Sequence, residues 1–133
     1  MMMATTPEGY VKDEIKKILE AAKIEYSMKT TRGYGKSGWP DFDTVFRGIY
    51  VTIEAKYDAD EKGPTALQRD VMKSIRASGG ITLVLDAKNY HLLAKLIADT
   101  DKMLAATGYV TPLMVRVAAT SLGIYYTEDV YGK

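Results

Sequence analysis

Hydrophobic and polar positions along this 133-residue chain follow helical spacing in some segments and strand-like spacing in others. Apolar residues recur every three or four positions over residues 11–22, which predicts an amphipathic helix. Thr6 and Pro7 precede it, and a threonine cap followed by proline is a common helix start. Residues 24–30 alternate between apolar and polar side chains, so we expect a strand there.

The most informative pattern predicts a β-hairpin around Arg47-Gly48. Two segments rich in β-branched and aromatic residues flank this dipeptide, and Pro40 marks where the first strand can begin. A two-residue turn would place Asp41 directly opposite Glu54 on one face of the hairpin. The opposite face would then carry the core residues, namely Phe42, Thr44, Phe46, Ile49, Val51, Ile53 and Ala55.

Charged side chains converge at the open end of this hairpin. Lys56 lies two residues beyond Glu54 and therefore shares its face with Glu54 and Asp41. Facing carboxylates repel each other, so a compensating cation is expected. A divalent metal ion is one candidate because hard cations bind oxygen ligands. An ion-pair cluster on a solvated sheet face is the alternative, and both interpretations fit the residues.

A second helix and a buried strand are predicted after the hairpin. Thr65 followed three residues later by Gln68 forms a capping box, which explains Gln68 without any active site. Gly79-Gly80 ends this helix. Residues 81–85 are all apolar or β-branched, a pattern typical of a strand that is buried on both faces.

Two more helices are predicted in the last third of the chain. Asp86 can cap the first of them, and Thr111-Pro112 begins the second. The second is almost uncharged, so it either closes the core or forms a self-association surface, such as a homodimer interface. His91 has no acidic neighbour in sequence, so we expect it to pack at the surface or in the core and not to join a catalytic triad. An edge strand or a frayed end is expected for Tyr125, Tyr126 and Tyr131.

Composition narrows the possible functions. At 47% hydrophobic content, residues 1–133 are expected to form one α/β layered domain with a substantial core. Cysteine is absent, which excludes disulfides, cysteine-ligated zinc and thiol nucleophiles. No apolar run approaches the ~18 residues of a membrane span, and no signal-peptide pattern opens the chain, so a cytoplasmic location is expected.

The net charge gives little indication of a nucleic-acid partner. One local group of cationic residues does suggest such a partner. The formal charge is only +1. Most lysines of the first predicted helix are explained as a solvated face. Lys29, Arg32 and Lys36 instead lie in or beside a glycine-bearing loop next to the hairpin end, where they are candidates for phosphate contacts.

Pro40-Asp41 followed by Glu54-Ala55-Lys56 resembles the signature of the PD-(D/E)XK nuclease superfamily. The flanking order of predicted elements is similar to its restriction-endonuclease-like αβββαβ core, a mixed sheet flanked by helices. Four segments further resemble the virus-type replication–repair nuclease branch (VRR-NUC), especially its small phage-encoded members. They are Thr6-Pro7-Glu8 with Val11-Lys12, residues 35–42, residues 53–56, and residues 64–68 leading to Gly79-Gly80. This resemblance covers about residues 6–86, and residues 87–133 would form a helical extension.

The resemblance implies a divalent-metal-dependent DNA endonuclease that selects branched, flapped or junction DNA during phage replication, recombination or repair. Such a protein would work in the host cytoplasm. Asp41, Glu54 and the Ala55 carbonyl would hold Mg²⁺ or Mn²⁺, and no small-molecule cofactor is expected. Glu8 would be a third metal carboxylate, although interaction with the helix dipole explains it as well.

The resemblance also assigns two supporting roles. Lys56 would position the attacking water and steady developing negative charge. Gln68 would support this lysine or contact the scissile phosphate. Asp43 shares the face of Asp41 in the predicted register and is either an auxiliary ligand or a surface acid, so it stays outside the core set. The alternative function is a non-catalytic nucleic-acid-binding or scaffold protein on the same fold, although the presence of every site residue favours catalysis.

Overall fold

The computed structural model describes residues 6–29 and 37–128. Its elements follow the predicted order of helix, strand, hairpin, helix, buried strand and two helices. They are α1 (Pro7–Ala21), β1 (Glu25–Met28), β2 (Phe42–Phe46), β3 (Ile49–Ala55), α2 (Ala66–Ala77), β4 (Ile81–Leu85), α3 (Leu92–Thr107) and α4 (Pro112–Ser121). None of the helices described is both long enough and apolar enough to span a bilayer.

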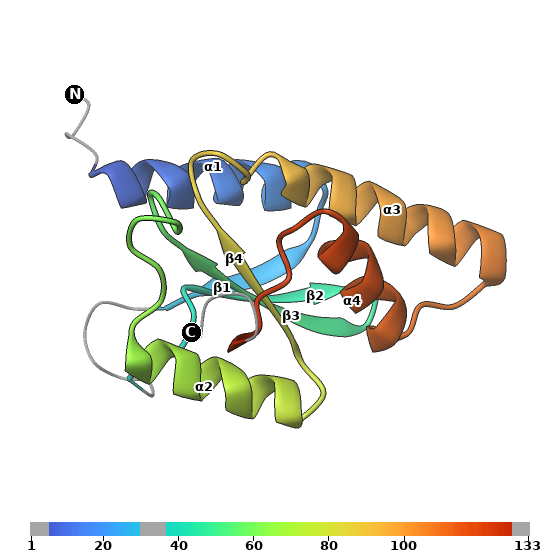
Figure 1. Cartoon of the computed structure of the whole chain (residues 1–133). Helices are drawn as coiled ribbons and strands as arrows, with labels where there is room; N and C mark the ends of the chain where they lie inside the picture. Colours follow the sequence, from blue (N-terminus) through green and yellow to red (C-terminus); the bar gives the residue numbers. More distant parts are fainter. Residues whose placement is uncertain (1–5, 30–36, 129–133) are drawn as a thin grey trace.

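The four strands form one mixed sheet in the order β1-β2-β3-β4. The first three strands are antiparallel, whereas β4 runs parallel to β3 and is reached through the crossover helix α2. Helices α1 and α3 lie along one side of the sheet and α2 lies along the other (Figure 1). The α/β class and the flanking of a mixed sheet by helices are therefore confirmed.

The β2–β3 hairpin has the predicted two-residue turn and register. Arg47 and Gly48 have φ values of 49° and 90°, the left-handed conformations that a type I′ turn requires. The guanidinium of Arg47 forms a two-point ion pair with Asp101 of α3, which ties the turn to that helix. Strand pairing runs from Phe46↔Ile49 to Phe42↔Ile53. The predicted core face is buried throughout.

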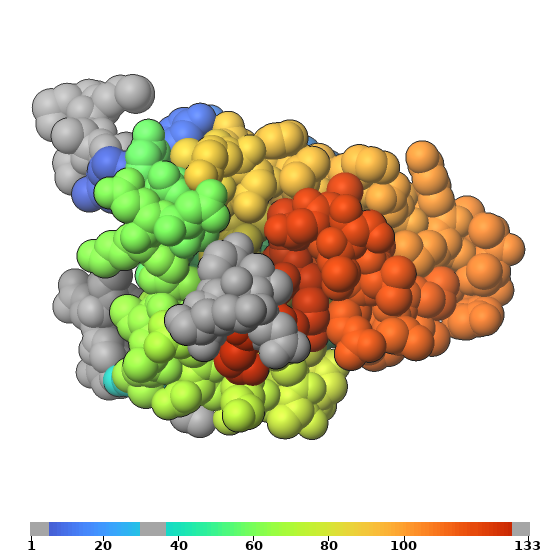
Figure 2. Space-filling model, in the orientation of Figure 1, coloured from blue at the N-terminus to red at the C-terminus, as the bar shows by residue number. Residues whose placement is uncertain are grey.

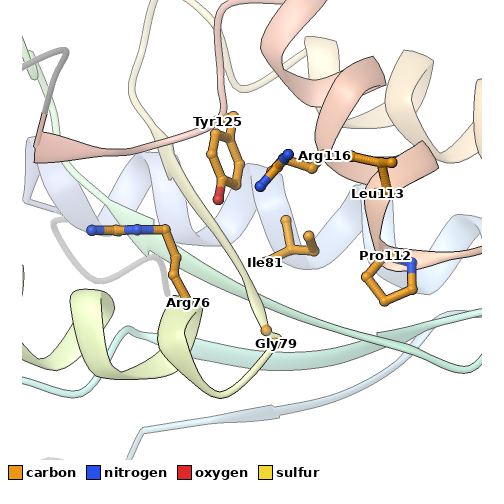
Figure 3. Close-up of a pocket in the computed structure, with 8 residues that line it drawn as sticks. Arg76, Gly79, Ile81, Pro112, Leu113, Arg116 and Tyr125 are labelled. Carbon is orange, nitrogen blue, oxygen red and sulfur yellow. The ribbon is translucent and has the colours of Figure 1, made fainter.

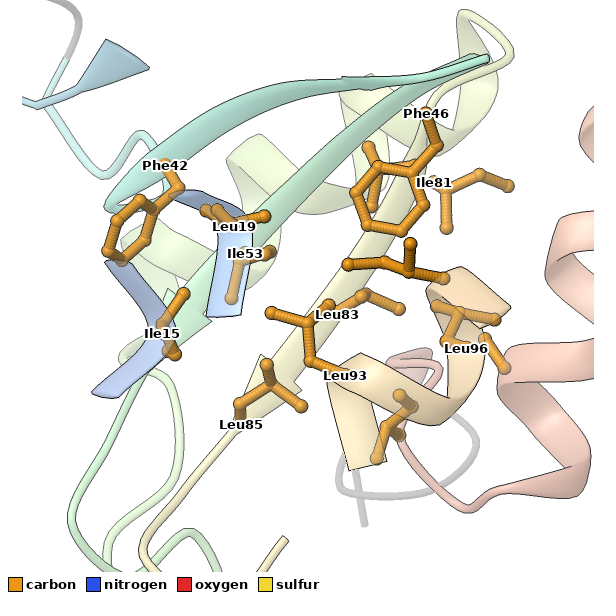
Figure 4. Close-up of a cluster of buried hydrophobic side chains, with 14 of the residues drawn as sticks. Ile15, Leu19, Phe42, Phe46, Ile53, Ile81, Leu83, Leu85, Leu93 and Leu96 are labelled. Atoms are coloured by element: carbon orange, nitrogen blue, oxygen red, sulfur yellow. The ribbon is translucent and has the colours of Figure 1, made fainter. Parts of the chain in front are cut away.

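The larger core lies between this face of the sheet and the helices α1, α3 and α4 (Figure 4). Its helical side chains recur at helical spacing, as predicted for residues 11–22, and each fully buried Leu, Ile or Phe contributes roughly 1.5–3 kcal/mol relative to exposure. The helices contribute Val11, Ile15, Leu19, Leu93, Leu96, Ile97, Val115 and Ala119.

A smaller cluster covers the opposite face of the sheet, beneath α2. It comprises Ala59, Met72, Val84 and Tyr126. The neighbouring Tyr125 pairs with Leu83 through one isolated bridge, so up to residue 128 the C-terminal segment forms one bridge with the sheet and no full edge strand. Tyr131 lies outside the described residues.

The predicted cap of the third helix is wrong. Asp86 accepts hydrogen bonds from the N–H groups of Ala59, Lys88 and Asn89, and the Asn89 side chain accepts one from the Asp86 N–H. This reciprocal pairing closes a turn and diverts the aspartate from helix capping. Helix α3 therefore begins only at Leu92.

Two further predictions on the C-terminal third agree with the structure. His91 is exposed and meets the ring of Tyr90 edge-on, as expected for surface packing. Val115 and Ala119 of α4 are fully buried, so the helix does close the core. The other side of α4 is exposed, and Figure 2 shows α3 and α4 forming the right-hand end of the molecule. Self-association through that side stays a prediction.

Candidate metal centre

The side chain of Asp41 continues the pairing of β2 with β3 by one hydrogen bond beyond the end of β2. Asp41 lies just before β2, and its Oδ2 accepts the N–H of Ala55 at 2.9 Å. Its backbone carbonyl accepts the N–H of Lys29 at 2.8 Å. The carboxylate is therefore held against the end of β3, and only 5% of the residue is exposed. The confirmed register is what places this aspartate beside Glu54.

The two oxygens of the Glu54 carboxylate have different surroundings. Oε2 accepts a hydrogen bond of 2.9 Å from Gln68 Nε2 and lies 3.4 Å from Lys56 Nζ. Oε1 is buried and has no hydrogen-bond partner among the described residues. A buried polar atom without a partner costs roughly 1–3 kcal/mol, so such an atom needs an explanation. Glu54 thus has one oxygen engaged and one available for a ligand.

Burial and the neighbouring Asp41 carboxylate together raise the pKa of Glu54 to about 8. Burial is the larger cause, because it penalises the charged form. The ammonium groups of Lys56 and Lys29 act in the opposite direction but do not cancel it. Ionisation of Glu54 beside Asp41 is therefore unfavourable despite the lysine neighbours, and a bound divalent cation would favour the ionised form.

Gln68 serves the helix and the site at once. Its Oε1 accepts the N–H of Thr65 at 2.9 Å, and its own N–H bonds to Thr65 Oγ1, which completes the predicted capping box. The remaining side-chain donor, Nε2, bonds to Glu54. The start of α2 and the end of β3 are thereby joined through one amide.

Lys12 occupies the position between Glu8 and Asp41. Its Nζ lies 3.7 Å from Glu8 Oε2 and 3.5 Å from Asp41 Oδ1. Within residues 6–29 and 37–128 no group of three His, Cys, Asp or Glu side chains is arranged to hold a metal. The structure thus brings Asp41 and Glu54 together and links Glu8 to them through a lysine. Direct metal binding by Glu8 stays a prediction.

From the sequence, Lys12 was expected on a solvated helix face. One feature of the sequence does indicate its contact with Glu8. Lys12 lies four residues after Glu8 on α1, a spacing that makes the two side chains neighbours on the helix surface. Its contact with Asp41 joins residues 29 positions apart, so it cannot be predicted from the local sequence and is revealed only by the folded structure.

Asp43 has partners of its own. Its Oδ1 accepts hydrogen bonds from Trp39 Nε1, at 2.9 Å, and from the Tyr50 hydroxyl. The carboxylate therefore holds two aromatic side chains in place. This agrees with leaving Asp43 outside the core set of site residues.

No protein-family model, curated protein or solved structure matches this chain. Its function must therefore be argued from the site.

The carboxylate site adjoins an accessible cleft. A pocket of about 410 Å³ is lined by Glu8, Lys56, Tyr57 and Lys62 among others. Lys29, whose N–H bonds to the Asp41 carbonyl, donates from its Nζ to the Trp39 carbonyl at 3.1 Å. Arg32 and Lys36, the other predicted phosphate contacts, lie outside the described residues. Ala55 is fully buried and pairs with Leu85, and ligation by its carbonyl stays a prediction.

A second hollow lies between α2 and α4, and one arginine that lines it has a structural role. It holds about 160 Å³, and Arg76, Arg116 and Tyr125 line it (Figure 3). The Arg76 guanidinium donates to the Thr82 hydroxyl, to the Tyr126 carbonyl and to the Glu128 carboxylate. Arg76 thus ties the C-terminal segment to α2, and none of the residues lining this hollow belongs to the carboxylate site.

Proposed function

We propose that this protein is a divalent-metal-dependent DNA endonuclease that uses Mg²⁺ or Mn²⁺. The observation that carries the proposal is the buried, unpartnered Oε1 of Glu54 beside the Asp41 carboxylate. An oxygen-only donor set suits hard cations, and incomplete coordination by the protein suits Mg²⁺, which retains waters and takes up phosphate oxygens. The order α1-β1-β2-β3-α2-β4 supports a restriction-endonuclease-like core.

The residues of the site have distinct tasks in this proposal. Asp41 and Glu54 would hold the cation, which would lower the pKa of a coordinated water and stabilise charge on phosphate oxygens. The Ala55 N–H orients Asp41, and Gln68 orients Glu54 so that Oε1 remains available.

Lys56 supplies positive charge at the reaction centre. Its Nζ lies 3.4 Å from Glu54 Oε2, and the residue is only 8% exposed, so its charge is weakly screened by solvent. A buried ammonium group donates hydrogen bonds to the attacking water and to developing negative charge on the phosphate. Lys12 adds positive charge beside Asp41, and the Lys29 ammonium acts on Glu54, which together favour the approach of a phosphate backbone.

One observation favours a second function, a non-catalytic nucleic-acid-binding or scaffold protein. The two carboxylates already have ammonium neighbours, because Lys12 lies 3.5 Å from Asp41 and Lys56 lies 3.4 Å from Glu54. An ion-pair cluster of this kind can persist without a metal. Calorimetric titration with Mn²⁺ separates the two functions, since uptake is expected only for the metal enzyme.

Cleavage assays test the leading proposal. Plain duplex, flapped and four-way-junction DNA are incubated with the protein and Mg²⁺ or Mn²⁺, and with EDTA as the metal-free control. We expect metal-dependent cutting, with preference for the branched substrates, that Asp41→Asn abolishes and that Asp99→Asn, at a helix position remote from the site, retains. Absence of cutting on every substrate, or cutting that persists in Asp41→Asn, would overturn the proposal.

A further inference from the structure

A pocket between the hairpin and the end of α2 is not used by the proposed chemistry, and no residue of the metal centre lines it. It has a volume of about 350 Å³, within the ~300–1,000 Å³ typical of small-molecule sites. Trp39 and Tyr50 come from the hairpin side, and Ser74, Ser78 and Gly80 come from the end of α2 and the turn that follows it. The pocket thus combines aromatic walls with small polar groups.

Asp43 holds both aromatic side chains of this pocket. Its single oxygen Oδ1 accepts from Trp39 Nε1 and from the Tyr50 hydroxyl, so the polar edges of both rings are directed toward one point. Burial and this hydrogen bond raise the pKa of the Tyr50 hydroxyl, which therefore stays protonated as a donor. No other aromatic ring in the described part of the chain stacks on Trp39, which is only partly buried and lines the pocket, so Trp39 is the ring on which a base would stack.

The opposite wall of the pocket is formed by the tightly packed Gly80 and by two exposed serines. A Cβ atom added to Gly80 would lie 2.6 Å from Ile75 Cγ2 and 3.0 Å from Tyr50 Cδ2, so only glycine permits this close packing against the tyrosine ring. The hydroxyls of Ser74 and Ser78 make no hydrogen bond with other described residues. Each hydroxyl can donate and accept, which suits the mixed donors and acceptors on the edge of a nucleobase.

The pocket is linked to the proposed reaction centre through Asp43. Asp43, which anchors its aromatic wall, and Asp41 lie on the same face of one extended segment, two residues and therefore roughly 7 Å apart. Trp39 precedes Asp41 by two residues. A nucleotide that adjoins a phosphate held at Asp41 and Glu54 could therefore reach the pocket with its base.

We infer that this pocket binds one unpaired nucleobase of the substrate strand, stacked on Trp39 and contacted by Ser74 and Ser78. The inference rests on the proposed nuclease function for its biological role, but the pocket itself can be tested without cleavage. Stacking of bases on aromatic side chains is a general mode of single-strand recognition. Occupation by an unpaired base would favour flapped or branched DNA over continuous duplex, because a paired base must first leave its stack.

Trp39 reports directly on the pocket because it is the only tryptophan in the chain. The full-length protein, kept in EDTA so that no cleavage occurs, is titrated with a pentamer of deoxythymidylate and with an abasic pentamer that carries the same phosphates. We expect quenching of the tryptophan fluorescence by the thymidylate pentamer and little change with the abasic pentamer. Equal responses to both, or no response to either, would overturn the inference.

A pocket-filling variant locates the base. Ser74→Leu places a larger apolar side chain at the pocket wall, and binding of the thymidylate pentamer is expected to weaken by about tenfold. Ser121→Leu, at an exposed position at the end of α4, is the matched control and should bind like the original protein. Unchanged affinity in a folded Ser74→Leu protein, as judged by circular dichroism, would contradict occupation of this pocket.

The same experiments separate this inference from the nuclease proposal. Base-dependent quenching without DNA cutting would retain the pocket and overturn the nuclease function. Metal-dependent cutting with no distinction between thymidylate and abasic pentamers would retain the nuclease and overturn the pocket.

Discussion

The side-chain amide of Gln68 donates a hydrogen bond of 2.9 Å to Glu54 Oε2. This contact joins the capped start of α2 to the end of β3 and leaves Glu54 Oε1 as the available oxygen. A helix cap and a ligand-orienting group thus share one residue. The fold and the proposed metal centre are coupled at this point.

Replacement of Gln68 by alanine should therefore impair both functions. We expect the free energy of unfolding to fall by about 1 kcal/mol from loss of the capping box. Affinity for Mn²⁺ should fall by about 10-fold or more, because partners that orient metal ligands typically contribute at this level. Urea denaturation and calorimetric titration measure the two effects. Lys73→Ala, an exposed change in the same helix, is the control and should alter neither quantity.

The Glu54 carboxyl should make stability depend on pH in a defined direction. Its pKa is raised to about 8 in the folded protein, whereas an unfolded glutamate titrates at about 4.3. The folded protein therefore binds more protons in this window, and the free energy of unfolding should fall as pH rises from about 4.3 to about 8. Glu54→Gln, which cannot ionise, should flatten this dependence. Urea denaturation at a series of pH values in EDTA measures it, and an equally steep fall in the variant would contradict the assignment to Glu54.

Metal binding should displace the same proton. At pH 7 the protonated Glu54 must ionise to bind Mn²⁺, so binding should release a fraction of a proton approaching one. Affinity should rise with pH and level off above about 8. Calorimetry in buffers of different ionisation enthalpy counts the released protons. Binding without proton release at pH 7 would contradict a metal site at Glu54.

Lys56 should be needed for cleavage but not for metal uptake. Lys56→Met keeps most of the aliphatic volume and removes the ammonium group. We expect the cleavage rate to fall by about 100-fold or more, as for loss of a group that stabilises developing charge. Mn²⁺ binding should persist, because the two carboxylates remain. Single-turnover cleavage and calorimetry test these outcomes, with exposed Lys95→Met as the control. Full activity in Lys56→Met would exclude the proposed role.

Local patterns were enough to predict most of the framework. The capping box at Thr65 and Gln68, the end of α2 at Gly79, and the buried strand β4 all follow from short-range chemistry, and the structure has each of them. The hairpin register followed from a two-residue turn, because one turn length determines every later pair. Asp86 was the exception, since its reciprocal hydrogen bonds with Asn89 close a turn ahead of α3 and divert the aspartate from helix capping.

The sequence alone was therefore enough to predict that Asp41, Glu54 and Lys56 lie at one end of a hairpin, because strand alternation and turn length are local properties. The surroundings of these residues depended on the folded chain. Lys12 reaches Asp41 only because α1 packs across the sheet, and Gln68 reaches Glu54 only because α2 begins beside the end of β3. The unpartnered oxygen of Glu54 follows from that packing, because burial and hydrogen-bond partners are properties of contacts between segments distant in sequence.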